Sequence, residues 1–195
     1  MSNKMDGQKA TNNLKRLAEQ FKVLDICNIV LDDSRFPKWS GSSVQRQHHY
    51  GLGGLATHVE DVANLCILNN AYFNSFGKGC NDKDLFLAAI FHDAGKMWDY
   101  LPKKEYTEWY SSPHKRNIHH ICKSTIVWHD AAIKFNISEE RHDIILHAIL
   151  SHHGQREWGS PVGPNSRLAY ILHYCDSLSA RVDDVMKQDL FSGGR

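Results

Sequence analysis

Apolar residues recur every three or four positions along most of the chain, which is the spacing of one face of an α-helix. This pattern predicts helices over residues 8–31, 55–67, 82–95, 118–135, 138–153 and 165–182, the first of them as one helix or two short ones. No convincing run of alternating apolar and polar residues indicates a sheet. The expected class is therefore all-α, a bundle of about six to eight helices.

The helical stripes also predict which side chains face the interior. His58 lies beside the apolar stripe of its helix and points inward or along its rim. His92 and Asp93 fall in the last turn of the helix that ends at Gly95. In the helix over residues 118–135, the stripe is predicted to run through Ile118, Ile121, Cys122, Thr125, Ile126, His129 and Ala132.

Two stretches without helical spacing are predicted to be loops. Residues 39–50 are rich in Ser, Gly, Gln and His, and residues 97–116 mix aromatic, charged and Pro residues. The second stretch is expected to be a long surface loop with room for a short hairpin. We expect one globular domain over residues 36–190, with residues 1–35 as a helical segment that packs on its core.

Composition is typical of a compact soluble protein. The 195 residues are 42% hydrophobic, and 23 basic against 22 acidic side chains leave a formal net charge of +1. This balance gives no sign of a nucleic-acid coat protein, although a local basic groove stays open. No apolar run approaches the ~20 residues of a membrane helix. Because the N-terminal residues are polar and lack a signal-peptide pattern, a cytoplasmic location without membrane contact is expected.

Histidine, rather than cysteine, marks the candidate chemistry. The five cysteines are scattered and form no C-x-x-C pair, so free and mostly buried thiols are expected. The 13 histidines all fall between His48 and His173. Several of them are expected around a metal and about half on the surface or in the core. Asp176 lies within an apolar helix, where a buried carboxylate needs a cation, although a surface position is equally open.

The order of these residues resembles a known pattern. His58, then His92-Asp93, then Asp176 resembles the H…HD…D signature of the HD superfamily of metal-dependent phosphohydrolases. The runs over residues 48–58, 151–161 and 172–180 also resemble the catalytic domain of YhaM-like 3′→5′ exoribonucleases. This resemblance extends over residues 36–186 and implies a helical bundle built around a metal site.

The resemblance implies the ligands of one or two divalent ions. The first ion would be held by His58, His92, Asp93 and Asp176, and the second by His120 and His152, with His153 as a neighbouring candidate. The glycine that usually precedes the third histidine of the family is His119 here, so the sequence leaves open whether His119 or His120 faces the metal. Imidazole and carboxylate ligands suit Mn, Co, Ni, Fe, Zn or Mg.

Lys96 and Asp93 are the residues expected to be catalytic. Lys96 follows the ligands by one turn and a glycine, where a cation can offset charge on a phosphate, although an ordinary helix C-terminal cation is the alternative. Contacts to the substrate are expected from His49, Trp98, Tyr100, Lys123 and Arg156. The aromatic residues of the 97–116 stretch would either wall a base pocket by stacking or pin the loop to the protein.

The predicted reaction is hydrolysis of a phosphoester by a metal-activated water. YhaM-like enzymes carry an oligonucleotide-binding barrel ahead of this domain, whereas the preceding residues are predicted to be helical here. Together with the near-neutral charge, this favours a small (deoxy)nucleotide as substrate, as for a dNTP triphosphohydrolase or a nucleotidase. The alternatives are an exonuclease on single-stranded RNA or DNA, and a non-catalytic HD module that binds metal and a nucleotide. A homo-oligomer is left open.

Overall fold

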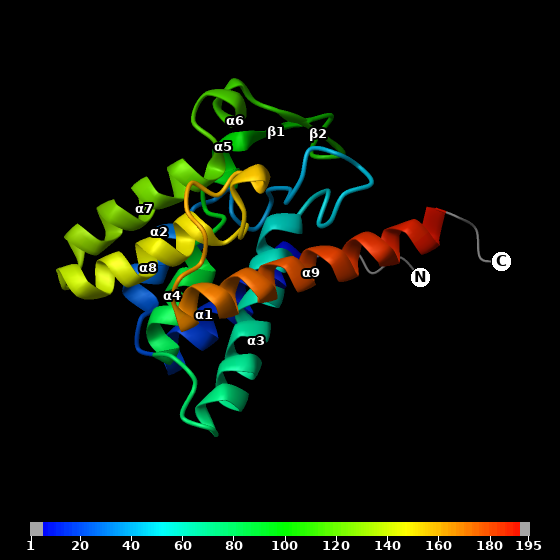
Figure 1. Cartoon of the computed structure of the whole chain (residues 1–195). Coiled ribbons are helices and arrows are strands. Elements are labelled where there is room, and N and C mark those ends of the chain that lie inside the picture. Colours follow the sequence, from blue (N-terminus) through cyan, green and yellow to red (C-terminus); the bar gives the residue numbers. More distant parts are fainter. Residues whose placement is uncertain (1–5, 192–195) are drawn as a thin grey trace.

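The computed structural model describes the backbone of residues 6–191 and the side chains of residues 6–185, and it is mostly helical (Figure 1). The longer helices are α1 (Gly7–Gln20), α2 (Leu24–Leu31), α3 (Gly54–Asn74), α4 (Asp82–Phe91), α7 (His120–Lys134), α8 (Glu139–Ser151) and α9 (Arg167–Phe191). Short elements lie between them: α5 (Lys96–Asp99), the strands β1 (Tyr100–Lys103) and β2 (Glu108–Ser111), α6 (Pro113–Asn117) and a 3-10 helix over Arg156–Trp158. The predicted all-α class is confirmed.

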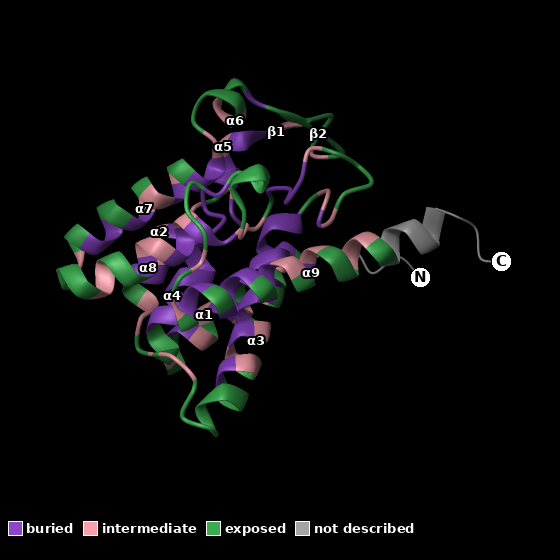
Figure 2. Ribbon diagram, viewed as in Figure 1, coloured by how far each residue is buried: buried purple, intermediate pink, exposed green. Residues whose placement is uncertain are grey.

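Helix α4 is the centre of the bundle. Residues 85–91 are apolar without interruption and all of them are buried, so this part of the helix has no solvent face. Helix α4 contacts α3 and α8 extensively, and it also contacts α2, α7 and α9. Figure 2 shows buried residues gathered on the inner faces of these helices and exposed residues on their outer faces. The C-terminal end of α4 therefore lies in the middle of the protein.

Helices α1 and α2 pack on this bundle. The carboxylate of Asp6 caps α1 by accepting the backbone N–H of Lys9 at 3.0 Å. Leu14 and Ala18 are fully buried, and α1 contacts α3 while α2 contacts α4 and α7. Burial of a side chain such as Leu14 contributes about 1.5–3 kcal/mol, so the N-terminal helices are part of the same core.

The stretch over residues 97–116 lies largely at the surface, as its composition predicts, but parts of it are buried against the bundle. It contains the predicted short hairpin, in which Tyr100 lies opposite Ser111, between α5 and α6. Tyr100 and Trp109 are both buried. The indole N–H of Trp39 donates to the Tyr100 carbonyl at 2.9 Å, and its ring meets the ring of Trp109 edge-on. The aromatic residues therefore fix this stretch to the bundle, because tertiary contacts outweigh its polar composition.

The predicted end of α4 is wrong. The helix ends at Phe91 rather than near Gly95, so His92 and Asp93 lie in the tight turn that joins α4 to α5. Gly95 belongs to this turn because the chain passes very close to α7. A Cβ at Gly95 would lie 2.2 Å from the carbonyl oxygen of His120. The glycine permits this close approach, and the chain turns there instead of continuing the helix.

The predicted buried face of α7 is only partly correct, although Ile121 and Ala132 are buried as expected. Ile118 and Ile126 are exposed, whereas Ser124 and Trp128 are buried. The hydroxyl of Ser124 accepts the backbone N–H of Gly95 at 2.9 Å, so a polar contact to the α4–α5 turn faces inward. This contact rotates α7 relative to the orientation that its apolar residues alone predict.

The structure also describes the cysteines and the apolar character of the helices. The five cysteines are free thiols, and Cys27, Cys66 and Cys175 are buried. Among residues 6–191, no helix combines the length and the apolar character that a membrane crossing requires.

Candidate metal centre

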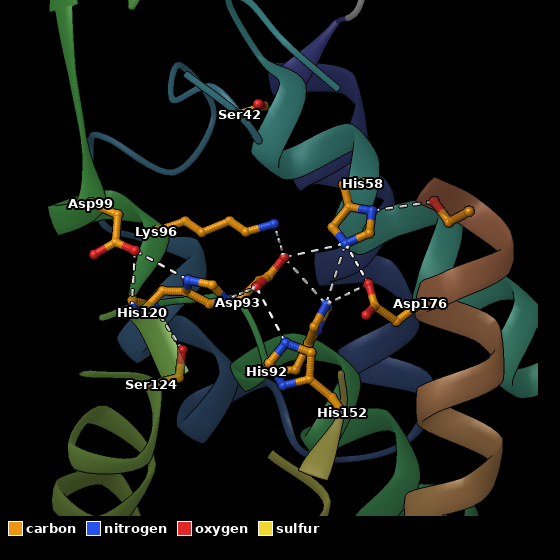
Figure 3. Close-up of polar contacts among 12 residues, drawn as sticks. Ser42, His58, His92, Asp93, Lys96, Asp99, His120, Ser124, His152 and Asp176 are labelled. Carbon is orange, nitrogen blue, oxygen red and sulfur yellow. Dashed lines mark hydrogen bonds and ion pairs between the residues drawn. The ribbon is translucent and has the colours of Figure 1, made fainter. Parts of the chain in front are cut away.

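Side chains from α3, from the turn after α4 and from α9 converge on one buried point (Figure 3). Nε2 of His58 lies 3.1 Å from Oδ1 of Asp176 and 3.2 Å from Oδ2 of Asp93. Nε2 of His92 lies 3.4 Å from Nε2 of His58. These four residues, here called the first cluster, each offer a ligand atom within 4.8 Å of the others. Imidazole nitrogens and carboxylate oxygens at this density are typical of a site for a divalent ion.

Local structure positions each member of the first cluster. His58 is buried in α3, and its Nδ1 lies 3.2 Å from the hydroxyl of Ser179 on α9. His92 follows the last residue of α4, where its Nδ1–H donates to the Ala89 carbonyl at 2.7 Å. Asp176 is 9% exposed on α9, which packs against α3. The long helices of the bundle thus hold the ligand atoms from three directions.

A second cluster lies beside the first and consists of His120, His152 and His153, with ligand atoms within 4.8 Å of one another. Nε2 of His120, at the start of α7, lies 3.4 Å from Nε2 of His153. His152 and His153 follow α8 directly, before the chain turns at Gly154 with φ of 85°. Between the two adjacent histidines, His120 is the one that faces this cluster, and His119 lies at its edge.

Asp93 lies between the two clusters. Its Oδ2 faces His58 at 3.2 Å, whereas its Oδ1 lies 3.6 Å from Nε2 of His120 and 3.7 Å from Nε2 of His152. One carboxylate thus presents one oxygen to each group of imidazoles. This arrangement suits a carboxylate that serves two metal ions at once.

The imidazoles share one orientation, with Nδ1 engaged by the protein and Nε2 directed inward. The Nδ1–H groups of His92 and His152 each donate to the carbonyl three residues earlier, and that of His153 donates to a loop carbonyl, all at 2.7 Å. Nδ1 of His120 lies 3.1 Å from the carboxylate of Asp99. These contacts favour the tautomer in which Nε2 carries the lone pair, as a metal ligand requires.

The centre contains buried polar atoms without hydrogen bonds. Oδ1 of Asp93 and Nε2 of His152 are buried and have no hydrogen-bond partner. Asp93 does have charged neighbours, among them Nζ of Lys96 at 2.6 Å. Since buried carboxylates and imidazole nitrogens are costly without partners, this donor set fits a bound divalent cation.

The protonation of the two clusters differs. Burial disfavours the charged form of His58, but hydrogen bonds to Asp176 and Asp93 outweigh it and raise the pKa of His58 to about 9. Burial lowers the pKa of His120 to about 4 and also lowers the pKa of His152. Without metal, the first cluster therefore carries a proton at neutral pH, whereas these two imidazoles of the second cluster are neutral.

Lys96 is a buried cation of the centre rather than a solvated helix end. Its side chain is 6% exposed, and its Nζ lies 2.6 Å from Oδ2 of Asp93. Burial opposes the charge, but Asp93 outweighs it and raises the pKa of Lys96 above its ordinary value. A positive charge is therefore fixed beside the point where the two clusters meet.

Sequence reasoning missed Asp99, which holds part of the second cluster. Asp99 is fully buried, and its Oδ1 lies 2.9 Å from Nδ1 of His114. Its Oδ2 accepts the backbone N–H of His120 at 3.0 Å in addition to facing the ring of that residue. No signal in the sequence indicates this role, because the stretch from residue 97 onward is predicted to be a loop and the helix α5 appears only in the structure.

Two of the predicted substrate contacts are buried close to the centre. The ring centroid of His49 lies 4.8 Å from that of His58, and its Nε2 lies 3.2 Å from the carboxylate of Asp61. Tyr100 is buried in β1, burial raises its pKa to about 12, and its hydroxyl lies 3.5 Å from Nζ of Lys115. Both side chains support their surroundings, and a contact with substrate stays a prediction.

The other predicted substrate contacts lie further out. Nζ of Lys123 and the guanidinium of Arg35 lie 4.6 Å and 4.1 Å from the ring of Trp98, as in cation–π pairs. Trp98 and Lys123 thus contact one another. Arg156 is exposed on the 3-10 helix that follows the second cluster. A role for these three residues in substrate binding also stays a prediction.

Comparisons with known proteins give matches to one family and to several relatives. The HD domain family matches residues 55–181, a range that includes every member of both clusters. Three relatives are named 3′-5′ exoribonuclease YhaM. The protein of Bacillus subtilis strain 168 is 35% identical over 142 residues, which cover 71% of this chain and 42% of that protein. The protein of Bacillus velezensis is 36% identical over 138 residues, which cover 70% of this chain and 41% of that protein. The protein of Bacillus licheniformis is 35% identical over 139 residues, which cover 71% of this chain and 42% of that protein. The chain thus spans less than half the length of these relatives, and no solved structure gives a significant match.

Proposed function

Since the chain belongs to the HD domain family, we propose that it is a metal-dependent phosphodiesterase that removes nucleotides from the 3′ end of single-stranded RNA. The observation that carries this proposal is the position of Asp93, which lies between two clusters of imidazoles and beside the buried Lys96. The relatives named as exoribonucleases support RNA as the substrate.

The two clusters would hold two divalent ions. The ligands of the first ion would be His58, His92, Asp93 and Asp176, and those of the second ion would be Asp93, His120, His152 and His153. When bound, such ions polarise a phosphate and lower the pKa of water. The contribution of this chain is to fix the direction of each Nε2 through the hydrogen bond at the opposite nitrogen.

Lys96 would stabilise negative charge on the phosphate that is cleaved. Its ammonium group is held 2.6 Å from Asp93, so a phosphate bound to the cations held by this carboxylate would lie next to it. A fixed cation in a buried site acts without reorganising as charge develops. Loss of one such group typically lowers kcat by about 10²–10³-fold.

We propose RNA as the substrate, although the net charge of the chain favours a small nucleotide. A charge of +1 is a sum over the whole chain and does not describe local distribution. Lys115 lies over the ring of Tyr100, and Arg35 and Lys123 lie over Trp98, so cations gather beside the segment that follows Lys96. Such cations can contact backbone phosphates. The three relatives described above are named exoribonucleases, which supports the exonuclease alternative over hydrolysis of dNTPs.

An assay of products tests the proposal. Metal-stripped protein would be resupplied separately with Mn²⁺, Co²⁺, Ni²⁺ or Mg²⁺ and incubated with 5′-labelled single-stranded RNA, the corresponding DNA, and dNTPs. The expected result is shortening of the RNA from its 3′ end with release of nucleoside monophosphates. Release of nucleosides and triphosphate from dNTPs, with the strands intact, would instead establish a small-nucleotide hydrolase.

The control is the double variant His92→Ala/Asp93→Ala, with folding verified by circular dichroism. It should bind less metal and release no product, because it lacks two ligands of the first cluster. Wild-type protein that binds metal and leaves every phosphoester intact would indicate a non-catalytic HD module.

A further inference from the structure

His119 adopts a backbone conformation that is strained for any residue with a side chain. Its φ is 70° and its ψ is 147°, a region that glycine enters freely. The fold requires this conformation, because the carbonyl of His119 accepts the N–H of Lys123 while the next N–H, that of His120, donates to Asp99. Glycine would satisfy these contacts without strain. The fold therefore explains the conformation of residue 119 but not its imidazole.

The ring of His119 lies at the rim of the second cluster. Its centroid is 4.1 Å from that of His120 and 6.3 Å from that of His153. A Cβ placed on Gly159 would lie 3.6 Å from Cε1 of His119, so the ring also borders the loop after α8. The side chain is half-buried and makes no capping hydrogen bond to α7, and one of its ring nitrogens lies within 4.8 Å of a carboxylate oxygen of Asp99.

Most other non-glycine residues with positive φ have an evident local reason. They lie at the ends of α1 and α7 or in the hairpin turn, where left-handed conformations are common: Lys22, Lys104, Glu105, Tyr106 and Asn136. The remaining two, His49 and His119, are histidines beside the metal centre. Of these, His49 has Asp61 within hydrogen-bond distance, whereas among the described residues His119 has Asp99 near it, within 4.8 Å, as a carboxylate neighbour beyond its histidine contacts.

We propose that His119 is a substrate-contact residue whose imidazole N–H donates to a phosphate of the RNA next to the phosphate that is cleaved. This inference rests on the function proposed above and narrows its substrate to a strand with at least two phosphates. The phosphate that is cleaved would lie at Asp93, whereas His119 contacts His120 and faces the outer side of the second cluster. Strain that persists at a site rim is commonly retained for such a contact.

Binding and stability can be measured without turnover. A fluorescent RNA tetranucleotide would be titrated onto the metal-free protein and its His119→Gly variant. We expect Kd to rise about tenfold, as for the loss of one hydrogen bond to a charged group. The same variant should melt about 2–4 °C higher, because glycine relieves the strain. His119→Asn, which offers an amide N–H, should keep part of the affinity.

Lys22→Gly is the matched control, since Lys22 is exposed, has φ of 57° and lies at the end of α1. It should also raise the melting temperature and leave Kd unchanged. An unchanged Kd in His119→Gly would overturn the proposal. A lower melting temperature would do so as well, because the ring would then be a structural support.

Kinetics on metal-loaded protein separate this inference from the proposed function. His119→Gly should raise KM for RNA with little change in kcat, and it should hardly affect cleavage of bis(p-nitrophenyl) phosphate, which has one phosphate. Equal losses on both substrates would contradict a contact to a second phosphate. If wild-type protein cleaves neither substrate with any metal, the proposed function fails, and the titration of the metal-free protein still decides whether His119 binds RNA.

Discussion

The two clusters share Asp93 but differ in charge and in exposure. The first cluster has two carboxylates, and all four of its residues are buried. The second cluster adds only imidazoles to Asp93, and His153 among them is half-buried. Because carboxylates neutralise a divalent cation and neutral imidazoles do not, we expect a tight first site and a weaker, more accessible second site.

The largest effect should come from the residue that the clusters share. Asp93→Asn removes a ligand charge from both sites, so we expect kcat/KM to fall by about 10³-fold or more. Elemental analysis should show less metal at both sites. Asp143→Asn, at an exposed carboxylate of α8, is the control and should leave metal content and activity unchanged. An Asp93→Asn protein that binds as much metal as the wild type would show that Asp93 is not a ligand common to both sites.

Substitution of Lys96 should distinguish a charged group that acts on the substrate from one that helps to bind metal. Lys96→Gln should lower kcat by about 10²–10³-fold with no loss of bound metal, because its ammonium faces Asp93 without being a ligand. Elemental analysis and single-turnover kinetics on the same sample provide the test. Parallel loss of metal and activity would show that Lys96 only supports the ligands.

Asp99 should distinguish the clusters directly. Asp99→Asn weakens the contact that orients His120, so the affinity of the second site should fall about 10–100-fold while the first site is unaffected. Isothermal titration with Mn²⁺ resolves the two affinities. A uniform loss at both sites would indicate a general disturbance of the fold rather than a role in the second cluster.

A difference in pH dependence should sharpen the comparison further. His58 has a pKa of about 9 without metal, so an ion entering the first cluster must displace its proton. Affinity there should rise about tenfold per pH unit between pH 6.5 and 8. The second cluster should show no such slope from His120, whose pKa is about 4. Titrations of metal at several pH values that give the same slope for both sites would contradict these assignments.

The same pKa values set the stability of the metal-free protein. Because the pKa of His58 is raised on folding, its stabilising contribution is complete below the ordinary histidine pKa of about 6.5. That contribution is lost as the pH rises through about 9. The melting temperature of metal-free protein should therefore fall over this interval, and His58→Gln should flatten the change. An increase in melting temperature over the same interval would have the wrong sign.

Helical spacing and the order of motif residues predicted much of the first cluster. His58 and Asp176 lie on long helices whose periodicity is clear, and the apolar run before His92 requires that this histidine end in the core. His120 and His152 were expected only from the resemblance to the HD family, and the sequence left open whether His119 or His120 faces the metal. Helical spacing gave the direction of His58, because a regular helix converts sequence spacing into direction.

The segment between the clusters was less predictable, because long-range contacts determine it. The face that α7 buries depends on the hydrogen bond from Gly95 to Ser124, and the position of Asp99 depends on His114 and His120. Neither contact has a periodic signal. The composition of the stretch over residues 97–116 indicates exposure, which holds for most of it, whereas packing against the bundle buries Tyr100 and Trp109.

Gly95 also has a consequence for how such a centre can change over evolution. Its missing Cβ lets the turn that carries Asp93 touch the backbone at His120, so main chain, rather than side chains, sets the spacing between the two clusters. Substitutions in the surrounding core change side-chain volume and leave that spacing intact. Core packing can therefore drift through many neutral replacements while the distance available to a pair of ions stays constant. A homologue that binds a different ion is expected to have different ligand side chains, while the backbone spacing between the two clusters stays the same.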